Sequence, residues 1–389
     1  MNDWKSGRIM DCAEINKVED LKPLTSLRFF AAMMIVVLHS LLFWPWFTGA
    51  PSALTSGVSF FFVLSGFILT HVYSVKGVAS YWGFVRDRVS RIWPMHMFAL
   101  LLLIIFVRND VATYDGVGLF SKSSQFVVDV FLLQSLTPFE TIIFSWNSVS
   151  WSISTELFFY LALPFLLMNI NSTWRLKMVG AAFISVGYAF LIFTLLNEQT
   201  SGKGLITPSS AIHANPIFRA FEFCLGICSW VIWRKYIKKL KLSFFVWSII
   251  EIAVVVNVAV WVSFFHKALL AFFDDASPLK LIFRILGSAW VYAALIIVCA
   301  SGRGVIGKIL NNKALIFLGE ISFAVYMLHM ILMKFFAFSL APDYQVGPVV
   351  FFMILIMLSA GCHFAIEKPM QKLLRTNERV NKKLVANTL

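Results

Sequence analysis

The chain has 389 residues, of which 59% are apolar and only 14% charged, and its mean hydropathy is +0.80. A soluble domain is typically about one quarter charged, so this composition excludes a soluble enzyme. Its 40 Phe and 13 Trp residues also exclude a disordered or collagen-like chain. The positive-inside rule accounts for the net charge of +13. We therefore expect the excess of basic residues to contact a lipid bilayer, and we expect no nucleic-acid partner.

Ten long apolar runs predict an all-α polytopic membrane protein, because about 20 apolar residues cross the hydrocarbon core as a helix. The runs cover residues 27–48, 57–75, 92–107, 151–170, 177–196, 216–233, 242–264, 281–300, 315–337 and 348–366. An eleventh apolar stretch at 126–136 is too short to cross. It is expected at the outer interface or as a re-entrant piece.

The distribution of Lys and Arg predicts the orientation of these spans. With ten crossings and the N-terminus inside, most basic residues fall in cytoplasmic segments, among them the cluster at 234–241. If 126–136 crossed as well, that cluster would face outside. Both termini are therefore predicted to be cytoplasmic, with a polar tail over 1–24, a ten-helix membrane domain over 25–370 and a basic tail over 371–389.

The first span carries two ionisable residues that share one helical face. Arg28 and His39 are 11 residues apart, which is close to three full turns and an axial offset of about 16 Å. Arg28 lies at the predicted cytoplasmic end, where a guanidinium suits an anion such as a phosphate. His39 lies near mid-membrane, where an imidazole suits acid–base chemistry. The plainer alternative is an Arg that reaches the interface and an unrelated, packed His.

Glu156 ends a polar segment, SWSISTE, at the start of the fourth span. Because this span enters from outside and His39 lies at a comparable depth, the two side chains are predicted to be close enough for direct or water-bridged contact. A carboxylate beside an imidazole fixes its tautomer and raises its basicity. The alternative is a Glu whose hydrogen bonds are satisfied by neighbouring Ser and Thr hydroxyls.

Three arginines, Arg86, Arg88 and Arg91, stand in the predicted cytoplasmic loop before the third span. Such a cluster binds a phosphorylated ligand or anchors the loop on anionic lipid. These residues alone do not choose between the two interpretations.

Further ionisable residues lie in the sixth and ninth spans. Arg219 and Glu222 stand three residues apart, where they either neutralise each other or line an outward cavity for a polar ligand. Ser322, Tyr326 and His329 fall on one side of the ninth span. His329 is expected to line a pore or to bond a neighbour, with a catalytic role as the alternative. The cysteines contain no CxxC pair, so we expect no metal site.

Together these segments resemble the membrane-bound acyltransferase-3 family over about residues 24–370. The resemblance rests on seven motifs in order along the chain: Arg28 with His39, FF-x-x-SGF within Ser59–Phe67, Arg88 with Arg91, SWSISTE ending at Glu156, the segment around Arg219 and Glu222, Ser322–Tyr326–His329, and Glu367-Lys368-Pro369. Members often carry Tyr at the positions of His96 and Phe323, and Pro soon after that of His329. These departures leave the roles of the two histidines open.

The resemblance implies an acyl-CoA donor, most of all acetyl-CoA, on the cytoplasmic side and an acceptor reached from the other face. It implies His39 as catalytic base or transient acyl carrier, supported by Glu156. The donor phosphates are expected on Arg28, Arg88 and Arg91, and the acceptor on Ser154, Arg219, Glu222, Tyr326 and His329. Some members carry an esterase-like domain after the last span. None is expected here, because the chain ends about 20 residues after its own last span.

We therefore expect a bacterial inner-membrane O-acetyltransferase that acts on an extracytoplasmic carbohydrate, such as a surface polysaccharide or its lipid-linked precursor. The alternative acceptor is a small molecule such as a macrolide, or a membrane lipid. In another class, His39 and Glu156 could form the proton relay of a transporter, although the chain has no internal repeat of the kind many transporters carry. A structural scaffold would not need several buried ionisable groups. The acyl chain length, the hydroxyl modified and the oligomeric state stay open.

Overall fold

A computed structural model describes residues 18–41, 52–78, 80–113, 120–196, 206–275, 277–339 and 346–375. Within these ranges the chain is almost entirely helical, and its β structure is a single bridge between Phe139 and Ile206. The all-α prediction is confirmed. Most of the two predicted tails, 1–17 and 376–389, lies outside the described residues, and the cytoplasmic location of both termini stays a prediction.

Nine helices in the described ranges are long and apolar enough to cross a membrane, and a tenth apolar helix is shorter. The nine are built on α1 (Lys22–Ser40), α2 (Gly57–Lys76), α3 (Tyr81–Phe106), α8 (Ile170–Leu195), α10 (Pro216–Lys235), α11 (Phe244–Val260), the pair α13 (Pro278–Leu286) and α14 (Ala289–Cys299), α16 (Lys313–Lys334) and α17 (Pro348–Cys362). The tenth is α7 (Trp151–Leu167). All ten fall on the predicted apolar runs, as expected for a multi-pass membrane protein.

The remaining helices are short, and they either connect these spans or extend them at one end. They are α4 (Asn109–Ala112), α5 (Lys122–Val130), α6 (Glu140–Ile143), α9 (Pro208–His213), α12 (His266–Leu270), α15 (Val305–Leu310) and α18 (Lys368–Leu374). The apolar stretch at 126–136 forms the end of α5 and a turn of helix at Gln134–Leu136. It is therefore too short to cross, as its length predicts.

Helix α3 begins well before the expected third span. Ser80 caps it by accepting a hydrogen bond from the backbone N–H of Gly83, and the first proline inside it is Pro94. The predicted loop at this position is therefore wrong, because its arginines stand on α3. Arg88 and Arg91 lie about one turn apart on the helix.

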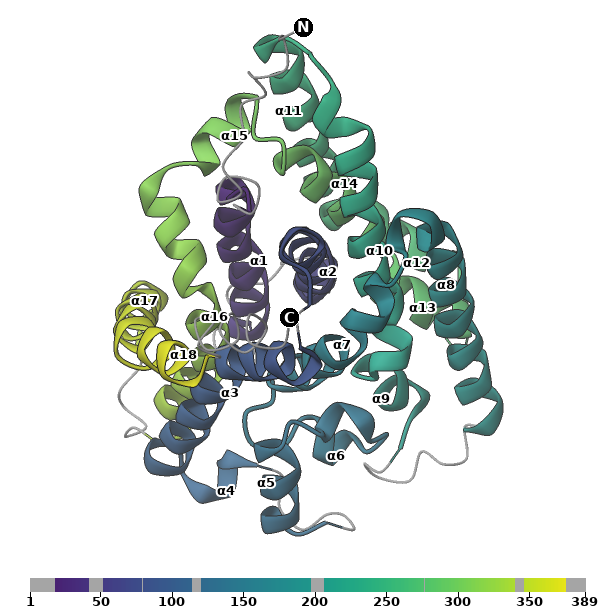
Figure 1. Cartoon of the computed structure of the whole chain (residues 1–389). Coiled ribbons are helices and arrows are strands. Elements are labelled where there is room, and N and C mark those ends of the chain that lie inside the picture. The colour runs from purple at the N-terminus through teal and green to yellow at the C-terminus, as the bar shows by residue number, and fades with distance from the viewer. Residues whose placement is uncertain are drawn as a thin grey trace, which may run out of the picture.

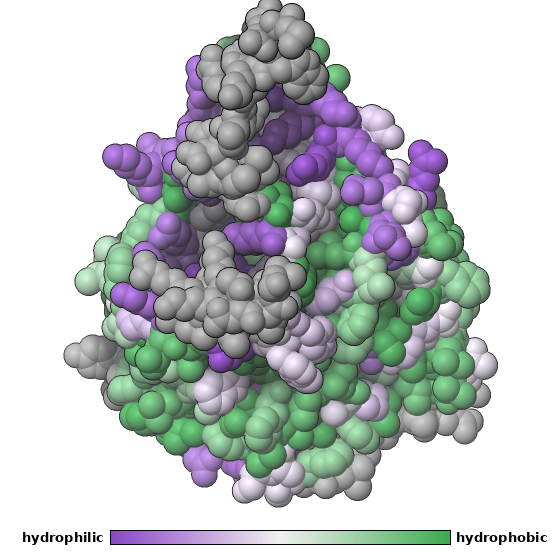
Figure 2. Space-filling view, viewed as in Figure 1, coloured by the Kyte–Doolittle hydropathy of each residue, from purple (hydrophilic) through white to green (hydrophobic). Residues whose placement is uncertain are grey.

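Helices α1 and α2 lie at the centre of the bundle, with α3, α7, α10, α14 and α16 around them (Figure 1). On the face of the molecule shown in Figure 2, hydrophilic residues gather on the upper part, over α11 and α15, while hydrophobic residues cover the sides and the lower part. The outer helix α8 leaves large apolar side chains such as Leu176 and Phe183 exposed. Such a surface suits contact with lipid.

Two glycines let pairs of helices pack backbone against backbone. A Cβ at Gly66 of α2 would collide with the carbonyl oxygen of Phe223 in α10, and a Cβ at Gly319 of α16 would collide with that of Thr25 in α1. Small residues are the usual means of close packing between membrane helices. The contact at Gly319 holds α16 directly against α1.

A buried polar cluster around Asp129 of α5 holds the segment before α7. Asp129 Oδ1 accepts hydrogen bonds from Gln134 Nε2 at 2.7 Å and Ser150 Oγ at 2.9 Å. The Asp129 backbone carbonyl accepts one from His96 Nε2 at 2.9 Å. Asp129 Oδ2 and Gln134 Oε1 are buried without a hydrogen-bond partner in the described part of the chain. Burial raises the pKa of the Asp129 carboxyl to about 8, which favours its acid form at neutral pH.

Gly66→Ala is expected to lower the thermal unfolding temperature of the purified protein. The added Cβ meets a backbone atom, which cannot move without separating α2 from α10, and over-packing of this kind costs about 1–3 kcal/mol. Gly180→Ala is the matched control, because a Cβ at this position in α8 meets nothing within 4 Å. Its unfolding temperature should stay unchanged or rise slightly. Equal behaviour of the two variants would contradict the close packing.

Asp129→Asn is expected to change how stability depends on pH. Between the ordinary pKa of 3.8 and about 8 the folded state holds a proton on Asp129 that the unfolded state has lost. Wild-type stability therefore falls as pH rises through this window and levels off above it. The amide variant cannot titrate, so its unfolding temperature should increase relative to that of the wild type as pH rises. Parallel curves would mean that Asp129 is ionised in the folded protein.

Candidate active site

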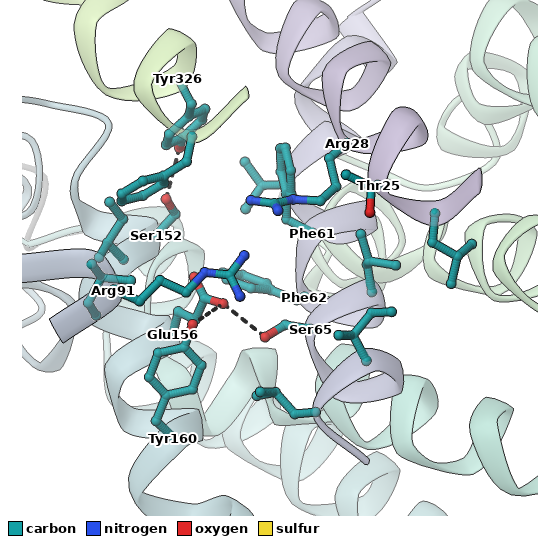
Figure 3. A pocket seen from close by; sticks show the side chains of 18 residues that line it. Thr25, Arg28, Phe61, Phe62, Ser65, Arg91, Ser152, Glu156, Tyr160 and Tyr326 are labelled. Carbon is teal, nitrogen blue, oxygen red and sulfur yellow. Dashed lines mark hydrogen bonds between the residues drawn. The ribbon is translucent and has the colours of Figure 1, made fainter. Parts of the chain in front are cut away.

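A cavity of about 240 Å³ lies between α1, α2, α3, α7 and α16. Much of its wall is apolar. Its polar lining residues are Thr25, Arg28, Ser65, Arg91, Ser152, Glu156, Tyr160 and Tyr326 (Figure 3). Helices that are far apart in the sequence therefore bring the residues of several predicted motifs to one place.

Arg28 and Arg91 point into this cavity from two different helices (Figure 3). Among the described residues, neither guanidinium has a hydrogen bond or an ion pair. The charge of Arg91 repels that of Arg28, whereas the carboxylates of Glu367 and Glu156 attract it. Two guanidinium groups that face one cavity, and whose N–H donors no described residue uses, can bind an anion.

Glu156 uses one carboxylate oxygen within the cavity wall. Its Oε1 atom accepts hydrogen bonds from Ser65 Oγ at 2.8 Å and from the Tyr160 hydroxyl at 2.6 Å (Figure 3). Among the described residues no hydrogen bond joins Glu156 to His39, so the direct form of the predicted contact is not observed, and the water-bridged form stays a prediction. The alternative of a Glu bonded by hydroxyls is the one observed, although the hydroxyls belong to α2 and to the next turn of α7 rather than to SWSISTE.

The hydrogen-bond partner of His39 is His329. His39 Nδ1 lies 2.9 Å from His329 Nε2, and His329 Nδ1 lies 2.6 Å from the backbone carbonyl oxygen of Tyr326. His329 is fully buried, whereas His39 is partly exposed. The contact follows from the packing of α16 against α1 at Gly319. Of the two expectations for His329, the bond to a neighbour is the one observed.

Tyr326 connects α16 to the segment that leads into α7. Its hydroxyl lies 2.9 Å from Ser152 Oγ and 3.1 Å from the backbone carbonyl oxygen of Val149. Tyr326 and Ser152 also line the cavity. The SWSISTE segment is thus connected to His39 by the contacts of Ser152 with Tyr326, of Tyr326 with His329 and of His329 with His39.

Arg88 differs from the two cavity arginines. Its side chain is 7% exposed and lies over the ring of Tyr73, 5.6 Å from the ring centre. Its Nε atom has no hydrogen-bond partner among the described residues, and it does not line the cavity. The arginines expected together on the donor are therefore divided into a pair that faces the cavity and one that packs beside it.

Three residues expected at the acceptor use their polar atoms within the protein. Arg219 Nη1 lies 3.1 Å from both carboxylate oxygens of Glu222, and Arg219 Nε donates to the backbone carbonyl of His213. Ser154 Oγ donates to the backbone carbonyl of Leu132 at 2.6 Å. The mutual neutralisation of Arg219 and Glu222 is the arrangement observed, and these contacts give acceptor binding no geometric support.

Sequence reasoning missed Tyr160 as a partner of Glu156. The signal was present, since side chains four residues apart on a helix lie on one face. Ser65 belongs to the FF-x-x-SGF motif, and its hydroxyl donates to Glu156 from another helix. Among the described residues, no three His, Cys, Asp or Glu side chains are grouped so that they could hold a metal ion.

Comparison with known proteins identifies the family of the chain. The family model Acyl_transf_3, described as an acyltransferase domain, matches residues 23–367. Acyltransferase MdmB of Streptomyces mycarofaciens is 28% identical over 92% of this chain and 93% of its own length. No solved structure matches.

Two further relatives are more distant. A Staphylococcus aureus (strain COL) protein provisionally named as an O-acetyltransferase, SACOL0978, is 22% identical over 92% of this chain and 58% of its own length. Nodulation protein 10 of Rhizobium leguminosarum bv. viciae is 25% identical over 79% of this chain and 81% of its own length. Since the family match covers nearly all of the predicted membrane domain, the chain belongs to the acyltransferase-3 family and is an acyltransferase built as a multi-pass membrane protein.

Proposed function

We propose that the protein is a transmembrane O-acyltransferase of a bacterial inner membrane. It moves an acyl group, most of all acetyl, from cytoplasmic acyl-CoA to a hydroxyl of an extracytoplasmic carbohydrate, such as a surface polysaccharide or its lipid-linked precursor. The observation that carries the proposal is the pair of guanidinium groups of Arg28 and Arg91, which have no bond to the described residues and face one cavity in a member of an acyltransferase family.

The donor is an anion, and the cavity has an excess of positive charge. The guanidinium groups of Arg28 and Arg91 can each bind a phosphate through two parallel N–H bonds. The single carboxylate of Glu156 in the cavity lining leaves this excess in place. The apolar walls suit the uncharged arm of a CoA thioester, which connects its phosphates to its reactive carbon.

His39 is the proposed catalytic base. It stands on the same helix face as Arg28, about 16 Å along the axis, so a donor anchored at Arg28 extends its thioester towards it. His39 takes the proton of the acceptor hydroxyl while the hydroxyl oxygen bonds to the thioester carbon. The carbon–sulfur bond then breaks, and the proton passes from His39 to the sulfur of CoA. In the two-step variant His39 carries the acyl group first.

Transfer of acetyl to a hydroxyl is supported by the O-acetyltransferase name of the Staphylococcus aureus relative, and the carbohydrate acceptor is supported by the family resemblance alone. A small molecule or a membrane lipid is the other outcome of an acceptor test. Purified protein in nanodiscs, given radiolabelled acetyl-CoA and each acceptor class in turn, would show which product takes the label. Label on lipid or on a small molecule alone would replace the carbohydrate.

Arg28→Ala and Arg91→Ala are each expected to raise the KM for acyl-CoA by about 10- to 100-fold, because each removes a charged hydrogen bond worth about 1.5–3 kcal/mol. The kcat should change less. Arg88→Ala should chiefly lower the unfolding temperature, since its side chain packs on Tyr73. Arg86→Ala is the control, because Arg86 is exposed on the same helix. An unchanged donor KM in the two cavity variants would remove these arginines from the donor site.

His39→Ala is expected to abolish acyl transfer, with a loss of at least about 100-fold in kcat because a general base is removed. Donor binding should persist, since Arg28 and Arg91 are unchanged. Release of CoA and saturable binding of acetyl-CoA measure the two effects separately. Thermal unfolding confirms that the variant is folded. Substantial turnover in this variant would remove His39 from the mechanism.

A further inference from the structure

Two histidines from helices at opposite ends of the sequence share a hydrogen bond. His39 Nδ1 of α1 and His329 Nε2 of α16 are 2.9 Å apart, and the two ring planes differ by only 10°. The distance alone does not say which nitrogen carries the proton. The second contact of His329 decides this.

His329 Nδ1 lies 2.6 Å from the backbone carbonyl oxygen of Tyr326. A carbonyl oxygen only accepts, so the proton of His329 is on Nδ1. A neutral imidazole has one N–H, so His329 Nε2 is an acceptor, and His39 Nδ1 must donate to it. The lone pair of His39 is then on Nε2, the nitrogen that points away from His329.

A doubly protonated His329 does not fit this environment. The side chain is 0% exposed, and the partners that the structure gives it are His39, Tyr326 and its own helix. A buried cation without a carboxylate partner is costly. The neutral form, with one donor and one acceptor both used, satisfies every polar atom of the ring.

We infer that His329 is a positioning residue that fixes the tautomer and orientation of His39, so that Nε2 is the basic atom. This deepens the proposed function and rests on it. When His39 Nε2 takes the proton of the acceptor hydroxyl, the bond from Nδ1 to His329 becomes charge-assisted and shorter. His329 thus stabilises the imidazolium as a carboxylate would, without placing a negative charge in the membrane. The proton leaves again from Nε2 to the sulfur of CoA.

The surroundings of His329 make this orientation rigid. Asn147 Nδ2 donates to the backbone carbonyl of Met327 at 3.0 Å, and the hydroxyl of Tyr326 is held at Ser152 and Val149. The turn of α16 that carries His329 is therefore tied to the segment before α7 as well as to α1. A base whose partner is fixed in this way does not have to reorient before reaction.

The test uses the full-length protein in nanodiscs with His329→Ala, His329→Gln and a matched control, His71→Ala. His71 is also a buried histidine that contacts a backbone carbonyl, that of Glu19, and it accepts a bond from Trp230 Nε1. It does not contact His39. Steady-state kinetics give kcat and the KM for acetyl-CoA, and solid-state ¹⁵N NMR of labelled histidine gives the tautomer of His39 without turnover.

We expect His329→Ala to lower kcat by about 10- to 100-fold or more, with the KM for acetyl-CoA nearly unchanged. His329→Gln should recover most of the lost kcat, because the amide oxygen of Gln can accept a hydrogen bond from His39 Nδ1 near the position of the lost Nε2. His71→Ala should lower the unfolding temperature and leave kcat within a few-fold. In the wild type His39 should be the Nδ1–H tautomer, and in His329→Ala a mixture.

Either of two results would overturn the inference: an Nε2–H tautomer of His39 in the wild type, or a wild-type kcat in His329→Ala. An inactive wild type would instead overturn the proposed function. The two failures are distinguishable because the tautomer is measured on the protein at rest.

Discussion

The close contact between α1 and α16 is the interaction on which the site depends. Gly319 has no side chain where it meets the backbone of Thr25, so the two helices approach more closely than larger residues would permit. This contact gives His39 a partner on α16, whereas Glu156 bonds to Ser65 and Tyr160 in the cavity wall. Helices from the first and last thirds of the sequence thus supply the two rings of one hydrogen-bonded pair.

The second constraint is charge. In a low-dielectric surrounding, a cation without a partner is costly, and the cavity holds two cations that bond to none of the described residues, Arg28 and Arg91, against the lining carboxylate of Glu156. Such an arrangement persists when it serves a ligand of opposite charge. By contrast, Arg219 and Glu222 satisfy each other within one turn of α10. The difference separates the two arginines that we propose bind the donor from one whose charge is paired within the protein.

These two features divide the proposed chemistry along α1. The anion site is at the end that contains Arg28, and the basic nitrogen is at the end that contains His39, on the same side of the helix. A donor with charged phosphates at one end and a thioester at the other matches this separation. The buried cluster around Asp129 and Ser150 lies beside the segment that holds Tyr326, and the backbone carbonyl of Tyr326 contacts His329.

The sequence by itself determined the membrane helices, because crossing the hydrocarbon core requires a minimum apolar length, and it placed Arg28 and His39 on one face, because the helical period is fixed. The family also followed from motifs in order. Only the tertiary structure decided that His329 and not Glu156 bonds His39, that Arg91 and not Arg88 faces the cavity, and that these arginines stand on a helix. Periodicity specifies the face on which a residue lies and its depth, but not which helix stands opposite. That choice depends on close contacts such as the one at Gly319, which arise only when the whole bundle is packed.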